Sequence, residues 1–290
     1  MSNHLLNRIE SLLPTFSKGQ RLIAQYITEH YDKAAFMTAS KLGSTVGVSE
    51  STVVRFAAEL GFEGYPQLQK AMQEMIRAKL TTLQRMEVSN NRIGEDVILE
   101  NVLNQDIEKI KRTLEETSRE DFDKAVNAIS EARNIYIIGV RSSQALATFL
   151  GYNFNLIFDN IHEIGANSET SIFEQMIRLN EKDVVIGISF PRYSRRVVRA
   201  LRFAHDRKAM VIAITDSSQS PLAQYSNCML QARSDMVSFA DSLVAPLSLI
   251  NALIAGVAMK HKDSVTRTFN ELEHIWEEYQ VYEKLDESGY

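Results

Sequence analysis

Residues 38–61 read TASKLGSTVGVSESTVVRFAAELG, and this stretch decides how the N-terminal quarter of the chain is interpreted. Apolar residues at helical spacing predict a first helix with one buried stripe, formed by Ala39, Leu42 and Val46. Gly47 follows at a point where a chain leaving a helix favours a positive φ, which glycine adopts freely. Ser49 is then expected to cap a second helix, because its hydroxyl can accept from a free N–H group of the first turn.

The second helix has a buried stripe and a polar, exposed start. The stripe consists of Val53, Phe56, Ala57 and Leu60, and Gly61 ends the helix. The outward side chains lie in its first half, the part of such a helix that enters the major groove of DNA. We interpret the stretch as a helix-turn-helix, with DNA contacts expected from Ser49, Glu50, Ser51, Thr52 and Arg55. The alternative is an ordinary helical hairpin with a solvated face.

Charge is distributed unevenly along the chain. The formal net charge of −5 argues against a protein that coats nucleic acid non-specifically. Residues 1–80 contain 9 basic and 7 acidic side chains, a net of +2, whereas the rest contains 23 basic and 30 acidic, a net of −7. A mildly basic head on an acidic body favours a DNA-binding domain joined to a second domain. Further contacts to the phosphate backbone are expected from Lys18, Lys41 and Lys70.

Several kinds of site are argued against by composition. Cys228 is the only cysteine, which excludes an intrachain disulfide and a cysteine-based zinc site and is consistent with a reducing cytoplasm. The six histidines are scattered, so we expect neither a metal site nor a cofactor. The first residues lack the uninterrupted apolar core of a secretory signal. Residues 242–259 carry no charge, but Pro246 and Asn251 interrupt them, so a core helix is favoured over a membrane span.

The chain is predicted to contain an all-helical domain over residues 1–79, a polar linker over 80–95 and an α/β domain over 96–290. In the second domain, short apolar runs without alternation predict strands buried on both faces, at 135–138, 184–188 and 210–214. Weaker strands are expected at 162–164 and 228–230. Helical stretches surround them at 96–114, 119–131, 143–158, 169–179, 195–207, 241–262 and 264–286. This alternation predicts a doubly wound parallel sheet.

Three hydroxyl-rich loops follow the strong apolar runs, at residues 139–143, 189–196 and 215–218. In a doubly wound sheet, ligands bind beyond the carboxyl ends of the strands. Hydroxyls, free N–H groups at a helix start and arginines together form a cradle for phosphate or another anion. We expect the effector-binding side chains to be Ser142, Ser143, Ser189, Arg192, Ser194 and Arg195. For any single loop, plain helix capping is the alternative.

Over essentially its whole length the chain resembles the RpiR (MurR/RpiR) transcriptional regulators. The resemblance rests on VGVSESTVVRFAAELGFEGYPQLQ (46–69), IYIIGVRSSQALA (135–147), DVVIGISFPRYSRRVVRAL (183–201) and VIAITDSSQSPLA (211–223). It implies a helix-turn-helix domain joined to a sugar-isomerase (SIS) domain, whose loops hold a phosphosugar effector by Ser and Thr hydroxyls. Ser143, Ser189 and Ser194 stand at the matching positions.

The loops depart from the family pattern at two places. Arg141 replaces the second glycine of the first loop, and Pro191 and Arg192 replace a serine and a glycine of the second. The second loop is therefore stiffer and more cationic than in the family. Two alternatives stay open: the site holds a different anion, or it holds phosphate by arginine instead of by serine hydroxyls and backbone.

These observations predict a cytoplasmic DNA-binding regulator of carbohydrate metabolism genes, controlled by a phosphorylated sugar or a similar anion. The resemblance implies a repressor, the commoner outcome in the family. A homodimer or homotetramer is expected, because one helix-turn-helix covers too little DNA for good specificity. The apolar stripe at 102–114 and the last helix are candidate interfaces, with packing inside the chain as an equal alternative.

Two other functions stay open. A phosphosugar isomerase needs a base beside the sugar, and Glu163, Glu169 and His205 are available. None of the three lies in a recognisable catalytic motif, and the first 80 residues would have no purpose, so we do not expect an enzyme. The third possibility is a DNA-binding protein whose SIS domain binds no ligand and serves only for dimerisation.

Overall fold

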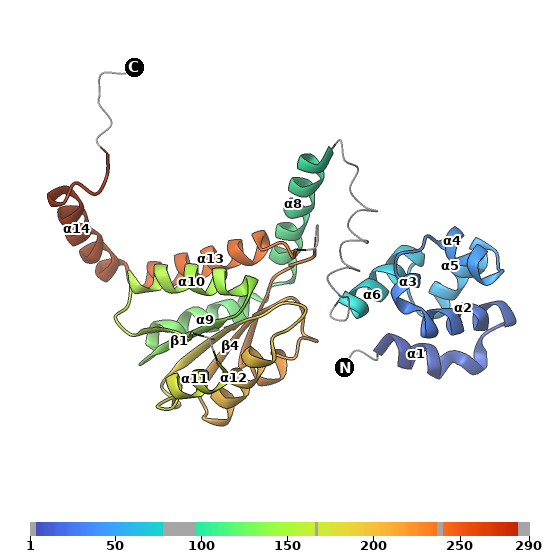
Figure 1. The fold of residues 1–290 in the computed structure, drawn as a ribbon, viewed down its shortest axis with the longest axis horizontal. Helices are drawn as coiled ribbons and strands as arrows, with labels where there is room; N and C mark the ends of the chain where they lie inside the picture. Colours follow the sequence, from blue (N-terminus) through green and yellow to red (C-terminus); the bar gives the residue numbers. More distant parts are fainter. Residues whose placement is uncertain (1–3, 78–96, 166–167, 237–239, 284–290) are drawn as a thin grey trace, which may run out of the picture. The chain divides into compact units, whose positions relative to one another are not determined.

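The computed structural model describes residues 4–77, 97–165, 168–236 and 240–283 (Figure 1). Contacts divide it into two compact units, Met1–Ile98 with Met236–Ala240 and Leu99–Asp235 with Asp241–Tyr290. The linker predicted over residues 80–95 lies outside the described residues.

The N-terminal unit is all-helical, as predicted. Its elements are α1 (His4–Leu12), η1 (Leu13–Thr15), α2 (Lys18–Glu29), α3 (Tyr31–Ala34), α4 (Ala39–Val46), α5 (Glu50–Glu59) and α6 (Tyr65–Arg77). Ser17 begins α2 with a capping box, exchanging two hydrogen bonds with Gln20. The core of the unit includes Phe16 and Phe56, whose ring centroids lie 5.1 Å apart. This aromatic contact fixes α5 against the segment that precedes α2.

Side chains of α6 fasten the turn between α3 and α4. The buried Tyr65 hydroxyl donates to the carbonyl of Met37 at 2.8 Å, and burial raises the pKa of Tyr65 to about 12. The amides of Gln69 and Gln73 donate at 2.8 Å to the carbonyls of Met37 and Ala35. Backbone groups that no helix satisfies thus find partners on α6, which fixes the place where α4 begins.

The second unit is built on a five-stranded parallel sheet in the order β2-β1-β3-β4-β5. The strands are β1 (Ile135–Gly139), β2 (Ile161–Glu163), β3 (Val184–Ile188), β4 (Met210–Thr215) and β5 (Cys228–Gln231). All five positions of β1 and of β3 are buried, as the apolar runs without alternation predicted. The other elements are α8 (Ile98–Glu116), α9 (Arg119–Glu131), α10 (Ser142–Asn155), α11 (Glu169–Gln175), α12 (Arg195–Asp206), η3 (Ala223–Tyr225), α13 (Val244–Lys260) and α14 (Lys262–Glu278).

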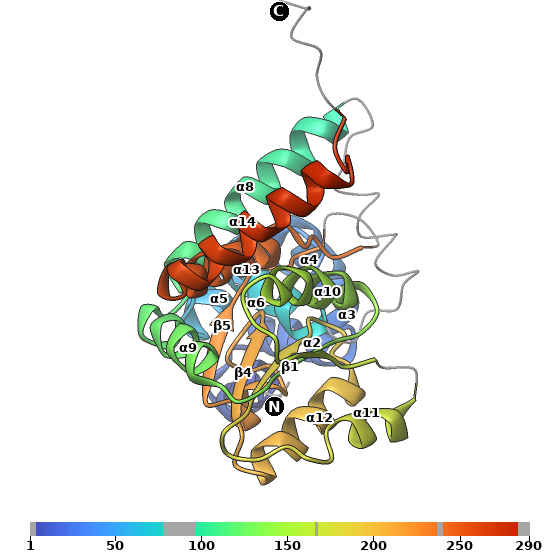
Figure 2. The same ribbon diagram turned by 90° about the vertical axis from the view of Figure 1, so that its left-hand side faces the viewer.

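Helices cover both faces of the sheet, so the fold is the predicted doubly wound α/β arrangement (Figure 2). On one face, α9, α10 and α13 contribute core residues such as Val126, Leu150 and Leu253. On the other, α11 and α12 contribute Ile172 and Leu201. Successive strand residues point to alternate faces, which is why each strand feeds both cores.

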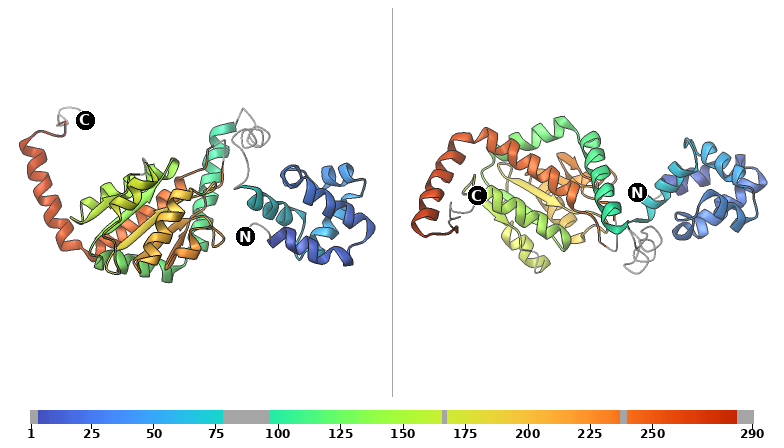
Figure 3. Two further views of the ribbon diagram at one scale, coloured as in Figure 1. Left: turned by 60° about the horizontal axis from the view of Figure 1, so that its bottom comes forward. Right: turned by 90° about the horizontal axis from the view of Figure 1, so that it is seen from above.

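The C-terminal helices differ in their bounds from the prediction. The helix expected at 264–286 begins at Lys262, directly after α13, and ends at Glu278. The helices α8 and α14 lie at opposite ends of the unit (Figure 3).

Among the described residues, no single helix has the length and apolar composition to cross a membrane. Only α13 and α14 together meet that test, and they are bent by 98°. The charge-free stretch forms all of α13 except Lys260, and the buried residues of α13 pack in the core, as predicted.

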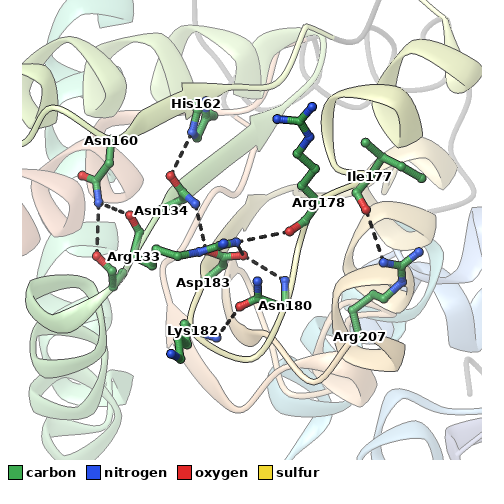
Figure 4. Close-up of polar contacts among 11 residues, drawn as sticks. Arg133, Asn134, Asn160, His162, Ile177, Arg178, Asn180, Lys182, Asp183 and Arg207 are labelled. Carbon is green, nitrogen blue, oxygen red and sulfur yellow. Dashed lines mark hydrogen bonds and ion pairs between the residues drawn. The ribbon is translucent and has the colours of Figure 1, made fainter.

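A network centred on Asp183 joins the amino-terminal ends of β1 and β3 (Figure 4). The Arg133 guanidinium donates to both carboxylate oxygens at 2.9 and 2.7 Å. The side-chain amide of Asn134 donates at 3.1 Å and the backbone N–H of Asn180 at 2.8 Å. Burial of Asp183 opposes its ionisation, but these donors outweigh burial and lower the pKa of the carboxyl. The network lies at the sheet edge opposite the predicted effector loops.

Asp183→Asn is expected to lower the free energy of unfolding by about 2 kcal/mol, because the amide keeps the shape and loses the charge. The folded-state pKa of Asp183 lies below its unfolded value, so its stabilisation is complete above about pH 4 and is lost as pH falls through the folded-state pKa. Denaturant titrations at neutral and acid pH measure both effects. Asp206→Asn, at an exposed side chain on α12, is the control. Equal loss in both variants would contradict the assignment.

Candidate functional site

The helix-turn-helix has the predicted geometry, with α4 and α5 joined by a tight turn. Gly47 has φ of 77°, the left-handed conformation that its position predicted. Gly43 on α4 has no room for a side chain, since a Cβ atom there would lie 2.8 Å from the carbonyl oxygen of Val48. This close approach holds the start of α5 against α4.

Ser49 differs from the prediction in one respect. It occupies the N-cap position of α5, but its hydroxyl makes no capping hydrogen bond to the backbone. The hydroxyl instead lies 2.9 Å from that of Ser51 and 2.8 Å from that of Thr52. The predicted N-cap position is confirmed, but the predicted capping hydrogen bond is wrong, because the Ser49 hydroxyl pairs with two neighbouring hydroxyls instead. The result is a hydroxyl cluster at the start of α5.

The predicted DNA-contacting side chains gather on the first turns of α5. Ser49, Glu50, Ser51 and Arg55 are exposed, and Thr52 is half-buried. Arg55 donates from Nε to the carbonyl of Ser51 at 3.2 Å, which orients its guanidinium along the helix toward the hydroxyl cluster. The positive end of the helix dipole lies at the same place, and it favours an anionic partner such as DNA phosphate.

Of the three predicted phosphate-contacting lysines, Lys18 and Lys41 are exposed and Lys70 is half-buried on α6. Lys18 adjoins Gly19, where a Cβ atom would lie 3.3 Å from the side chain of Thr52. The start of α2 is thus near the start of α5, so the structure brings Lys18 close to the predicted DNA-reading side chains.

The second candidate site lies at the carboxyl edge of the sheet. The strand order places β1 between β2 and β3, and the chain leaves β1 for α10 on one face and β3 for α12 on the other. Such a reversal of direction is where doubly wound sheets bind ligands. The loops after β1, β3 and β4 meet there, since the three strands are adjacent and parallel.

The loop after β1 is a tight turn into α10. A Cβ atom on Gly139 would lie 2.4 Å from the carbonyl oxygen of Ser143, so no other residue fits there. Arg141 adopts φ of 57°, a conformation that favours glycine and costs roughly 1–3 kcal/mol in other residues. Ser142 is exposed and Ser143 is buried, and within the described part of the chain the Ser143 hydroxyl makes no hydrogen bond. This hydroxyl is available to a ligand.

The loop after β3 is folded back on itself. The Ser189 hydroxyl accepts from the backbone N–H of Ser194 at 3.1 Å, and Ser189 is buried. Ser194 precedes α12 as its N-cap residue, although its side chain makes no capping hydrogen bond. Arg192 and Arg195 are exposed at this edge. The predicted effector-binding residues therefore come from two adjacent loops that both lead into helix starts.

The loop after β4 contributes residues that sequence reasoning left out of the predicted set. Thr215 is buried, and its hydroxyl lies 2.9 Å from the carbonyl oxygen of Ser189 and 2.8 Å from the hydroxyl of Ser220. The Tyr193 hydroxyl donates to the buried carboxylate of Asp216 at 2.8 Å. Thr215 and Asp216 begin the predicted loop 215–218, directly after an apolar run, which is the signal for them. Tyr193 lies in the predicted loop 189–196, but no sequence pattern joins it to Asp216.

The three side chains considered as isomerase bases contact different elements of the second unit. Glu163 lies against Gly151 of α10, and Glu169 forms an ion pair with Arg199 on α12. His205, near the end of α12, faces the ring of Tyr225 with centroids 6.1 Å apart. In the described part of the chain, no hydrogen bond or ion pair joins any of the three to another.

Comparison with known proteins gives matches over both units. Residues 3–79 match the helix-turn-helix domain of the rpiR family, and residues 128–256 match the SIS domain. The chain is 25% identical to the HTH-type transcriptional regulator HexR of Escherichia coli K12 over 284 residues, covering 91% of this chain and 92% of HexR. It is also 25% identical to an uncharacterised regulator of Caldanaerobacter subterraneus, over 89% of this chain and 92% of that protein.

Solved structures are similar as well. The sugar isomerase domain of an RpiR transcription factor from Sphaerobacter thermophilus matches with a TM-score of 0.57 and 31% identity, covering 60% of this chain and 96% of that domain. NanR of Vibrio vulnificus, solved in complex with ManNAc-6P, matches in fold with a TM-score of 0.57 and 24% identity, over 94% of this chain and 99% of NanR. The chain belongs to the RpiR family of helix-turn-helix transcriptional regulators, with a SIS domain following the DNA-binding domain.

Proposed function

We propose that this regulator is a cytoplasmic repressor of carbohydrate metabolism genes, and that a phosphorylated sugar bound at the carboxyl edge of its sheet controls its affinity for DNA. The observation that carries the proposal is the meeting of three hydroxyl-rich loops at the point where the chain reverses direction between β1 and β3. The same chain carries a DNA-binding domain, whose affinity for DNA the site can regulate.

The site's chemistry supports an anionic ligand. The starts of α10 and α12 offer backbone N–H groups and the positive ends of two helix dipoles. Ser143 and Ser194 offer hydroxyls, and Arg141 and Arg192 add exposed guanidinium groups at the same edge. The strained backbone at Arg141 is further support, because such strain clusters at ligand sites. The complex of NanR with ManNAc-6P gives a precedent for a sugar phosphate in this fold.

Isomerase activity has less support in the structure. The three candidate bases contact different elements, and Glu169 is engaged by Arg199. A proton transfer between sugar carbons needs a base within hydrogen-bond reach of the substrate. We therefore assign the carboxyl-edge site to binding and regulation.

A homodimer is part of the proposal, and α8 supplies its interface. This helix exposes an apolar stripe at three- and four-residue steps, with exposures of 54% at Leu103, 49% at Ile107 and 82% at Leu114. Its buried side chains, by contrast, are polar: Lys109 and Thr113. Because the buried face of α8 is polar and its exposed face is apolar, the exposed face is suited to bind a partner. The same stripe on a second copy of the chain can pack against it, since the interface of a symmetric homodimer uses the same surface of both copies.

The DNA-binding role is tested on a duplex selected by the full chain from a random pool. Arg55→Ala is expected to weaken binding roughly tenfold or more, because a base contact from the reading helix is lost. The logarithm of the affinity should fall linearly with the logarithm of salt concentration as bound counterions are released. Lys33→Ala, at an exposed side chain on α3, is the control and should bind normally. Recovery of no duplex by the wild-type chain would contradict the role.

The effector role is tested by thermal shift and calorimetry against inorganic phosphate and a panel of pentose, hexose and aminohexose phosphates. Ser143→Ala and Arg192→Ala are expected to weaken binding of the active compound roughly tenfold or more, since each removes a donor to a charged group. Both variants should keep the DNA affinity of the unliganded chain. Ser130→Ala, whose hydroxyl only bonds within α9, is the control. A ligand-free scaffold would show no response to any compound.

The dimer is tested by sedimentation. Ile107→Asp places a charge at the centre of the apolar stripe and is expected to convert the dimer to a monomer, because an unpaired charge is costly in a buried interface. Ile177→Asp is the matched control, at another exposed isoleucine outside α8. A variant that stays dimeric would exclude α8 as the interface.

A further inference from the structure

The polar face of α8 contacts the last residue of β5 and the residues that follow it. The Thr113 hydroxyl accepts a hydrogen bond of 2.9 Å from the backbone N–H of Arg233, whose guanidinium forms an ion pair with Glu116. The Thr117 hydroxyl lies 2.8 Å from the carbonyl oxygen of Gln231. The Gln231 amide also donates to Glu116 at 2.9 Å. The last two turns of α8 are therefore held by polar contacts to residues 231–233.

Polar contacts also hold the middle of α8. Asp106 accepts from the hydroxyl of Ser242 at 2.7 Å and from the ammonium group of Lys109 at 2.9 Å. The polar contacts of α8 can be exchanged for hydrogen bonds to water at a small net cost in free energy. Separating an apolar contact would cost more, because it exposes apolar surface to water. A small displacement of the segment after β5 can therefore change how α8 docks.

Thr215 connects the contacts between α8 and residues 231–233 to the candidate effector loops. Its hydroxyl contacts the carbonyl of Ser189 and the hydroxyl of Ser220, at 2.9 and 2.8 Å. Its own carbonyl accepts a hydrogen bond of 2.8 Å from the N–H of Ala232. Ala232 lies between Gln231 and Arg233, the two residues that contact α8. A continuous path of hydrogen bonds and one covalent segment thus runs from the loop after β3 to α8.

We propose that α8 is the output element of the effector site, an inference that rests on the proposed effector function. An anion bound among the loop hydroxyls displaces Ser189 and the loop that contains Ser220, and Thr215 passes the displacement to residues 231–233. The docking of Thr113 and Glu116 on that segment changes in response. Because α8 is the first helix after residues 78–96, its new position is passed along the chain toward the DNA-binding unit. The effector acts only by favouring one docking over the other.

Amide hydrogen exchange on the full-length chain tests the path, with inorganic phosphate and ManNAc-6P as probes. In the wild-type chain, probe binding is expected to change exchange both in the loop peptide 189–194 and in the α8 peptide 109–117, the latter roughly fivefold or more if coupling has its usual strength. Glu116→Ala should keep the loop response and lose the α8 response. Glu108→Ala, an exposed glutamate on the same helix, should keep both. Thr113→Val supplies a second, nearly isosteric variant in case Glu116→Ala does not fold.

The outcomes separate this inference from the proposed function. A loop response without an α8 response in the wild-type chain would overturn the inference and leave the effector site intact. An α8 response that survives in both Glu116→Ala and Thr113→Val would also overturn it. Absence of any loop response to either probe, together with no thermal shift across the sugar phosphate panel, would overturn the effector function and the inference with it.

Discussion

The parallel alignment of β1, β3 and β4 is the constraint on which the second unit depends. Backbone pairing sets Ile135 beside Val184 and Val184 beside Met210, so the three strands begin in step and end at one edge. Their loops meet there because the strands are adjacent, although those loops are some 50 and 26 residues apart in sequence. The Asp183 network at the opposite edge holds the starts of β1 and β3 together, so both ends of the alignment are fixed.

Features set by local sequence were predicted well. The apolar runs predicted the buried strands, because runs too short for a helix and without alternation are typical of strands buried on both faces. Gly47 gave the turn of the helix-turn-helix, because its backbone conformation is one that glycine adopts freely. The serines of the first two loops lie after β1 and β3, where the sequence placed them, and their role in effector binding stays a prediction.

Features set by distant contacts were not predictable in the same way. Tyr193 meets Asp216 across 23 residues, and no spacing rule joins them. The stripe on α8 was recognised, but periodicity shows only that two faces differ. The inverted burial of α8 follows from partners 114 to 120 residues away, such as Gln231 and Arg233. Ser49 occupies the predicted N-cap position, but its hydroxyl bonds to neighbouring hydroxyls instead of to the backbone.

The long sequence separation between α8 and Arg233 has a consequence for synthesis of the protein. The helices of the DNA-binding unit up to α6 are complete once Arg77 has left the ribosome, and domains generally fold as units from the N-terminus. The contacts of Thr113 and Glu116 wait for residues 231–233. Until then α8 has neither its polar docking nor a folded domain behind its apolar stripe. A nascent or truncated chain would therefore contain the helices α1 to α6 before α8 has its contacts to residues 231–233.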